Sequence, residues 1–191
     1  MTEPLQHKPT KAEREARRAQ REAERLAKFA EKAKNLPDSV HGVPVVEIDY
    51  TAVSKKRVKE LRREFTECRR QFLISLAENR ADDLKAAGLS DSAIELMAKG
   101  RAPGGYNVHH KNPLAGGGKN EFSNFILIKD EPYHKDFHKV SDIQIVGMKE
   151  GETKKVKIPM PDGCVFVPPE RQAEQVKTLS PILLMRRANS R

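Results

Sequence analysis

The sequence has few aromatic residues, no tryptophan and only two cysteines. Aromatic residues make up 5% of the 191 positions, whereas charged residues make up 33%. Such a chain can bury only a modest core, and much of it is expected to be solvated helix. Cys68 and Cys164 lie far apart and belong to no CxxC pair. They therefore predict neither a zinc knuckle nor a disulfide framework, and they are compatible with a reducing compartment.

Long apolar runs are also missing from the sequence. No run approaches the roughly 18 apolar residues that indicate a transmembrane helix. The first residues are polar and charged, without the apolar segment of a secretory signal. The sequence thus predicts no membrane partner. Its localisation stays unknown: the cytoplasm is the default without a signal, and a toxin would instead be delivered into a target cell.

Positive charge is abundant, with a formal net charge of +9 and a pI of about 9.6. A charge of this size predicts a polyanionic partner, most often nucleic acid, although ordinary basic proteins are also common. Residues 1–35 hold ten basic and six acidic residues among alanines, a composition that favours helix. This segment is either a solvated helix or an arm that binds nucleic-acid phosphates.

A second helix is expected from Ser54, a suitable N-cap, to Ala87. Its apolar residues recur at steps of three and four and form one buried stripe. The members of this stripe are Val58, Leu61, Phe65, Cys68, Phe72 and Leu76. The opposite face carries eight basic residues against three glutamates, which is either a solvated face or a phosphate-binding one. We take Arg62 and Arg63 as candidate phosphate ligands. A short helix should follow over residues 91–99.

The chain changes character after His138. Residues 143–146 and 155–158 have strand-like composition, and residues 164–167 are a candidate third strand. These segments predict a small C-terminal β-appendage. From Pro169 the sequence favours a helix with an apolar group, residues 182–185, near its end.

The most informative segment runs from Tyr106 to His138 and contains four of the six histidines. It reads as a strand ending in His109 and His110, a glycine-containing loop, a second strand at residues 125–128, and a helix. His134 and His138 are four residues apart and lie on one helix face. Histidines gathered from a helix and from a distant strand end are typical of a site for one metal ion.

The order of these features resembles the HNH, or ββα-metal, endonuclease superfamily, and most closely the nuclease domains of colicin-type toxins. The matching features are His109-His110, Gly116-Gly117-Gly118, Asn124 before an apolar strand, and His134…His138. The resemblance covers 33 residues and says nothing about the flanks. It implies that His109, His134 and His138 bind one divalent cation, Zn²⁺, Mg²⁺ or a similar transition metal. His110 would then be the general base, and Asn124 would hold the loop that positions it.

Physical chemistry supports this interpretation of the motif. Phosphodiester hydrolysis requires an activated water and positive charge at the phosphate, and a histidine can accept a proton near neutral pH. Four further basic residues are candidates for positioning the nucleic-acid backbone. They are Arg101, Lys111, Lys119 and Lys135. Each of the histidines, glycines or lysines alone has an ordinary structural explanation, and only the ordered set indicates a nuclease.

We therefore expect an α+β fold with a helical N-terminal part, a ββα-metal core and a small β-appendage. The expected divisions are a charged helical arm at 1–35, a linker at 36–53, a nuclease domain at 54–140, and the β-appendage and tail at 141–191. The predicted function is metal-dependent endonuclease cleavage of DNA with low sequence specificity, with RNA as a second candidate substrate. A toxin would also bind an acidic immunity protein. The motif is equally compatible with a phage or restriction nuclease. The alternative to an enzyme is a catalytically inactive nucleic-acid-binding protein in which the metal is structural.

Overall fold

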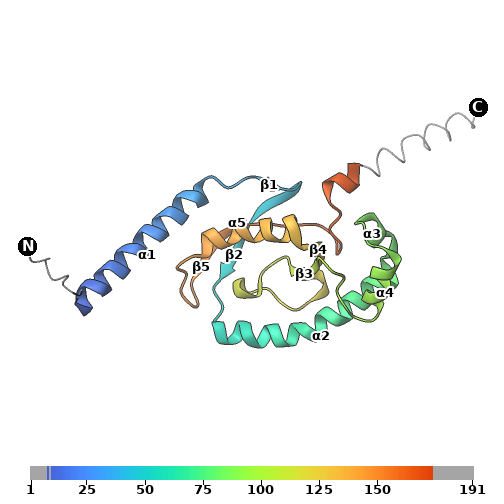
Figure 1. Cartoon of the computed structure of the whole chain (residues 1–191), viewed down its shortest axis with the longest axis horizontal. Coiled ribbons are helices and arrows are strands. Elements are labelled where there is room, and N and C mark those ends of the chain that lie inside the picture. The colour runs from blue at the N-terminus through green and yellow to red at the C-terminus, as the bar shows by residue number, and fades with distance from the viewer. Residues whose placement is uncertain (1–7, 9, 174–191) are drawn as a thin grey trace, which may run out of the picture.

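The computed structural model describes residue 8 and residues 10–173, which form a mixed α+β fold with two small antiparallel sheets (Figure 1). A long helix, α1, begins the fold, as the composition of residues 1–35 predicts. The elements run in the order α1 (Lys11–Lys34), β1 (Ser39–Val40), β2 (Val43–Thr51), α2 (Lys55–Asn79), α3 (Ala81–Ala86), α4 (Asp91–Ala98), β3 (Tyr106–His110), β4 (Phe125–Lys129), α5 (Lys135–Ile145) and β5 (Thr153–Pro159). Short helical turns at Leu114–Gly116, Phe122–Asn124 and Asp130–His134 connect β3, β4 and α5.

The β3–β4 hairpin is the centre of the molecule. In its antiparallel register His109 lies opposite Ile126 and His110 lies opposite Phe125. Successive side chains of a strand point to opposite faces, so the four buried residues of β4, 125–128, contribute to two cores. Phe125 and Leu127 pack with α2, α3 and α4, whereas Ile126 and Ile128 pack with α5. The hairpin is thus covered by helices on both faces.

Two of the predicted helices flank this hairpin. Helix α2 buries Phe72 and Leu76 of the predicted stripe, and also Leu73, against one face. Helix α5 buries Phe137 against the other face. The helix expected over residues 54–87 is interrupted at Arg80, so that α3 can turn back and bury Leu84. Cys68 lies partly buried beside the α2 core. Helix α4 forms over residues 91–98, as the sequence indicates.

Residues 36–53 are not merely a connecting segment, because they contain β1 and β2. Strand β2 pairs antiparallel with β5 along seven residues, from Val45–Pro159 to Thr51–Thr153. The sheet order is therefore β1-β2-β5. The 155–158 strand is confirmed, but it does not belong to a separate C-terminal appendage. Pairing of segments about 100 residues apart leaves no local sequence signal, because each strand alone shows only weak alternation.

The prediction of a strand at residues 143–146 is wrong, because α5 extends to Ile145. Ile145 faces the β2–β5 sheet, while Ile143 and Val146 face Leu26 and Phe29 of α1. A helix that is covered on two sides needs apolar residues on both sides. Apolar residues therefore follow each other closely in the run Ile-Gln-Ile-Val, and this pattern is similar to that of a strand.

The segment expected as a third strand at residues 164–167 makes only an isolated bridge, between Val165 and Leu127. This bridge joins the segment to β4 and not to β5, so it does not extend the β1-β2-β5 sheet. Residues 169–173 are helical. The remainder of the predicted tail helix, with residues 182–185, lies outside the described residues.

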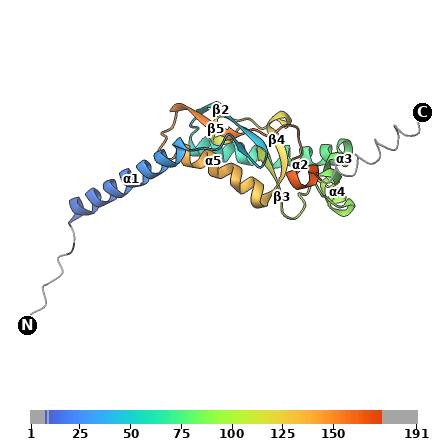
Figure 2. The same ribbon diagram turned by 90° about the horizontal axis from the view of Figure 1, so that it is seen from above.

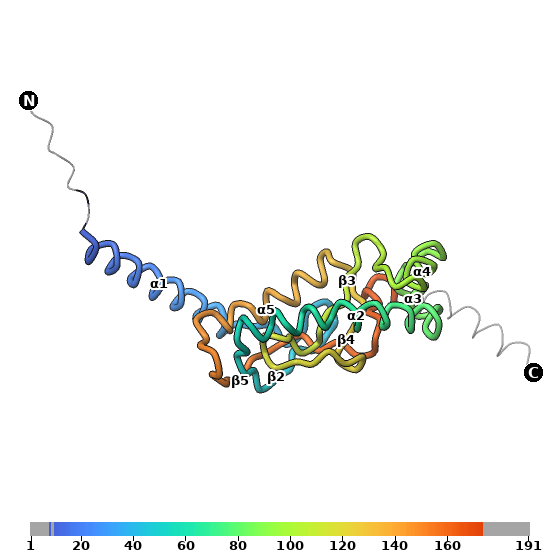
Figure 3. Tube along the Cα trace, turned by 90° about the horizontal axis from the view of Figure 1, so that it is seen from below, coloured from blue at the N-terminus to red at the C-terminus, as the bar shows by residue number. Residues whose placement is uncertain are grey.

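Helix α1 extends away from the rest of the molecule in all three views (Figures 1, 2 and 3). A capping box formed by Thr10 and Glu13 starts it. Its C-terminal half packs on α5, where Leu26 approaches Gly147 so closely that a β-carbon there would lie 2.8 Å from Leu26 Cδ2. Among the described residues, no helix has the length and apolar character needed to cross a membrane.

Candidate metal centre and active-site cleft

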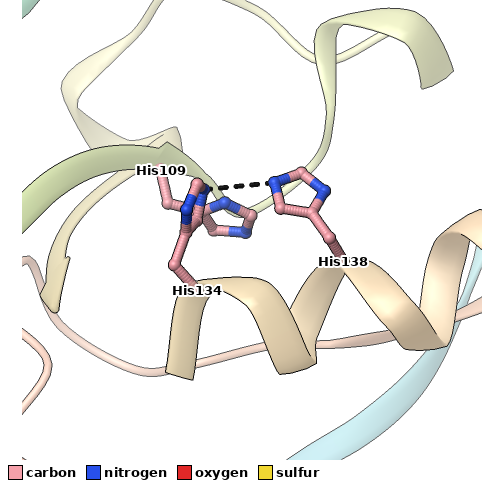
Figure 4. A group of neighbouring side chains, drawn as sticks. All are labelled: His109, His134 and His138. Carbon is pink, nitrogen blue, oxygen red and sulfur yellow. Dashed lines mark hydrogen bonds between the residues drawn. The ribbon is translucent and has the colours of Figure 1, made fainter. Parts of the chain in front are cut away.

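Three histidines predicted to be metal ligands lie together between β3 and α5. The potential ligand nitrogens of His109, His134 and His138 all lie within 4.8 Å of one another. Their ring centroids are 4.7–5.1 Å apart. Figure 4 shows His134 and His138 rising from neighbouring turns of the helix toward His109. His109 is the last inward-facing residue of β3 and is only 7% exposed. The three side chains form a partly buried triad that can hold a metal ion.

One pair of nitrogens in this triad fits a cation well. His134 Nε2 and His138 Nε2 are 3.1 Å apart. Two unprotonated nitrogens at this distance would repel through their lone pairs, so a proton or a cation must lie between them. Two ligands of a tetrahedral zinc ion are about 3.3 Å apart when each Zn–N bond is about 2.0–2.1 Å. A donor set of three imidazoles also suits zinc and similar transition metals better than it suits magnesium.

An acidic residue behind the triad fixes the orientation of one ligand. Asp130 Oδ1 lies 3.5 Å from His134 Nδ1, and the side-chain amide of Asn107 donates a hydrogen bond to the same oxygen. A carboxylate beside Nδ1 favours the tautomer with its proton on that nitrogen, leaving the Nε2 lone pair for a metal. Neither Asp130 nor Asn107 stood out in the sequence, since an isolated Asp at a strand end is common.

Burial favours the neutral form of two of the three triad imidazoles, His109 and His134. Desolvation lowers the pKa of His109 well below its usual value, and the nearby His138, His134 and His110 lower it further. Desolvation also lowers the pKa of His134, followed by the effect of His138, while Asp130 acts in the opposite direction. A metal ligand must be an unprotonated imidazole, so this environment is suited to metal binding near neutral pH.

The lowered pKa values predict a pH-dependent stability in the presence of a chelator. Below the unfolded-state pKa of about 6.5, unfolded histidines bind protons while folded His109 stays neutral, so stability decreases as pH falls. His109→Gln removes one such group and should reduce the slope between about pH 5 and 6.5 by up to about 1.4 kcal/mol per pH unit. Urea unfolding of both proteins at several pH values measures this. Equal slopes would contradict the prediction.

His110 points to the other face of the hairpin and is not part of the triad. Its ring packs against Phe65 of α2, with centroids 4.3 Å apart, and against Phe125. His110 Nε2 lies 2.9 Å from Asn120 Oδ1, and Asn120 Nδ2 donates to the backbone carbonyl of Leu61 at 2.8 Å. That carbonyl can only accept, so the amide nitrogen must face it and the amide oxygen must face His110. Nε2 of His110 therefore carries the proton, and Nδ1 is the basic nitrogen.

Asn124 fastens the loop between the two strands. Its Oδ1 accepts from the backbone N–H of Asn112 at 2.8 Å, and its Nδ2 donates to the carbonyls of Asn112 and Lys119. The loop is further fixed by close packing. A β-carbon on Gly118 would lie 1.9 Å from the Asn112 carbonyl oxygen, and one on Gly116 would lie 2.4 Å from the Tyr50 ring. Two of the three glycines are therefore required by contacts within the protein itself.

One cleft of about 370 Å³ connects the triad with His110. The side chains of all four histidines line it, together with Arg62 and Tyr50. Arg62 is exposed at its edge and is the predicted phosphate ligand that the structure places in the cleft. Asp142 of α5 also lines it. Burial, and to a smaller extent the charge of Asp142, raises the pKa of the Tyr50 phenol, which therefore stays neutral.

The other predicted phosphate ligands are not lining residues of this cleft. Lys135 pairs with Glu131, and Lys119 lies 3.8 Å from Glu121. Arg101 follows α4, which Figure 1 places at one end of the molecule beside α3. Lys111 is half-buried after β3, and Arg63 is exposed next to Arg62. The sequence did not predict the contacts of Asn120, Asp130 and Asn107. Some of their partners lie far away in the sequence, and isolated Asn and Asp residues have several common roles.

Comparison with known proteins gives one distant homologue and no assigned activity. No protein-family model and no solved structure matches the chain. Uncharacterized protein YhhZ of Escherichia coli (strain K12) is 36% identical over 138 residues, which cover 71% of this chain and 34% of YhhZ. The chain thus spans about a third of the length of that curated relative. The name of YhhZ states no reaction, so the function must be argued from the site.

Proposed function

We propose that this protein is a metal-dependent endonuclease of the HNH, or ββα-metal, type that hydrolyses phosphodiester bonds of DNA. The observation that carries the proposal is the arrangement of four histidines in one cleft, with three forming a triad and the fourth held apart in a defined tautomer. The order strand, loop, strand and helix from Tyr106 to Ile145 supports it, since that is the order of the ββα-metal core.

The three ligand histidines and the general base have separate tasks in this mechanism. His109, His134 and His138 would hold one divalent cation, which would supply positive charge to the phosphate and to the leaving oxygen. His110 accepts the proton of the attacking water at Nδ1, the nitrogen left unprotonated by the hydrogen bond from Nε2 to Asn120. Burial lowers the pKa of His110, and the Asn120 hydrogen bond acts in the opposite direction. His110 is therefore neutral and able to accept a proton at pH 7.

Arg62 and Asn124 assist the substrate and the loop. Arg62 lines the cleft from α2, and a guanidinium can donate two parallel hydrogen bonds to a phosphate. Asn124 acts through the loop, because its bonds to the backbone of Asn112 keep the end of β3 in place. None of these contacts reads a base, so we expect low sequence specificity, and RNA remains a substrate to compare with DNA. A toxin role, with an acidic immunity protein as partner, is a further extension of this proposal.

Plasmid nicking tests the proposal directly. The full chain is incubated with supercoiled plasmid and Zn²⁺, Mg²⁺, Mn²⁺ or Ni²⁺, with excess chelator as the control, and a structured RNA is tested in parallel. We expect open-circular product with at least one metal and none with chelator. Absence of cleavage of both nucleic acids with every metal would reject the enzyme and favour a binding protein with a structural metal.

The Asn120 hydrogen bond gives a sharper prediction about the base. Asn120→Asp places a negative charge next to His110 Nε2, which favours the imidazolium and should move the acidic limb of the pH–kcat/KM profile to higher pH. Asn120→Leu removes the acceptor, allows the other tautomer and should lower kcat by about 10–100-fold. Nicking rates measured across pH test both variants. A purely structural role would instead leave the position of the acidic limb unchanged in Asn120→Asp.

A further inference from the structure

Helix α1 sorts its charges by face. At about 100° per residue, its eight basic residues between Lys11 and Lys32 fall within roughly one third of the circumference. They are Lys11, Arg14, Arg17, Arg18, Arg21, Arg25, Lys28 and Lys32. The glutamates lie along the two edges of this sector, and the alanines occupy the opposite side. A helix whose charges serve only solubility has no need for this separation, since alternating signs support it equally well.

The positive charges of this sector are largely unneutralised. We call the group Arg14, Arg17, Arg18, Arg21 and Arg25 the arginine face. Within the described part of the chain only Arg25 of this group forms an ion pair, with Glu22 at 3.5 Å. All five arginines border a common surface hollow, together with one acidic residue, Glu22. Like charges gathered around one space repel each other, so a bound anion would stabilise the arrangement.

The arginine face is also fully accessible. Residues 11–25 are all exposed, whereas Leu26, Phe29 and Ala33 are partly buried near α5. Figures 2 and 3 show this half of α1 standing clear of the remaining elements. The C-terminal half thus anchors α1 to α5, which carries His138 and begins directly after His134. A ligand held along α1 is thereby connected to the metal centre through the contact between α1 and α5.

We propose that the arginine face binds the phosphate backbone of the nucleic-acid substrate, without regard to sequence, at a distance from the cleft. This inference extends the proposed nuclease function and rests on it. The basic sector spans 22 residues from Lys11 to Lys32, about 33 Å of helix, along which a duplex carries one charge per about 1.7 Å. Arginine suits this partner, since its planar guanidinium matches phosphate oxygens bidentately.

The side opposite the arginine face favours nucleic acid over an anionic membrane surface. A helix that lies in a membrane interface buries bulky apolar side chains opposite its basic residues. Along residues 11–25 of α1 the opposite side carries only alanines, such as Ala12, Ala16 and Ala23. The bulkier Leu26 and Phe29 are already used against α5. This helix therefore has little apolar area to insert into lipid.

Binding measurements on the full chain test the inference. The arginine-face variant carries Arg14→Gln, Arg17→Gln, Arg18→Gln and Arg21→Gln, and glutamine keeps a high helix propensity. A matched control carries Lys99→Gln, Lys129→Gln, Lys149→Gln and Lys157→Gln, four exposed positions outside the cleft, so that both have the same net charge. Both are made with His110→Ala to keep a labelled DNA duplex intact. Fluorescence anisotropy then gives the affinity between about 50 and 200 mM salt.

We expect the slope of log affinity against log salt concentration to be smaller in magnitude for the arginine-face variant than for the control. The difference between the two slopes should be about 3–4. Its affinity at low salt should be at least tenfold weaker. Equal slopes and affinities would overturn the inference. So would a variant that loses binding to phosphatidylserine vesicles but keeps binding to DNA. Because binding needs no cleavage, a reduced slope in a chain that never nicks plasmid would reject the nuclease and retain the arm.

Discussion

His110→Ala should abolish plasmid nicking while the metal content of the protein stays unchanged. The side chain of His110 lies on the α2 face of the hairpin, between Phe65 and Phe125, and its Nε2 is bound to Asn120. The triad lies on the α5 face. Removal of a general base reduces a rate by about 10²–10⁴-fold. Nicking assays and metal analysis of the same purified sample measure both outcomes together.

Two controls separate loss of the base from loss of structure. His110→Ala leaves a gap beside Phe65, so His110→Gln, which fills more of the space, should be equally inactive if the basic nitrogen is what matters. Thermal unfolding with metal present should show that both variants remain folded. Added imidazole should restore part of the activity of His110→Ala by occupying the gap. Undiminished nicking by either variant would reject His110 as the base.

The sequence was sufficient for the local elements of the site. His134 and His138 lie four residues apart on one helix, and the alternating residues of β4 face two cores as a strand pattern requires. These features depend on neighbours within a few residues, so local periodicity is enough to predict them. The placement of His109 in the same triad followed only from the resemblance, because adjacent strand residues point to opposite faces. The structure shows that they do so and yet line one cleft.

Features that depend on partners far away in the sequence could not be predicted from local sequence patterns. Strand β2 finds its partner β5 about 100 residues later, and residues 143–146 become helical because α1 and the sheet cover both sides of α5. Asn120 bonds to the carbonyl of Leu61 in α2, 59 positions earlier. In a sequence, an asparagine in a loop indicates only a turn. Its effect on the His110 tautomer emerges when the hairpin is packed against α2.

His138→Ala should remove both the bound metal and the nicking activity. It deletes one of three ligand nitrogens and leaves His134 Nε2 without the neighbour 3.1 Å away. Loss of even an indirect partner of a ligand weakens metal binding by about 10–100-fold, so loss of a ligand should exceed this. His41→Ala is the matched control. His41 contacts the same helix through Asp136 at 2.7 Å but lies outside the triad.

Thermal unfolding tests the assignment of the metal ligands without a measurement of nuclease activity. A metal at 1,000 times its dissociation constant stabilises the folded state by about 4 kcal/mol, which corresponds to roughly 8–16 °C in Tm for a chain of this size. Chelator should therefore lower the Tm of the unsubstituted protein and of His41→Ala by that amount. His138→Ala should melt at the chelator-treated temperature whether or not metal is present. A His138→Ala protein that still gains thermal stability from metal would place the ion elsewhere, and the triad could not then be the centre around which His110 and Arg62 act.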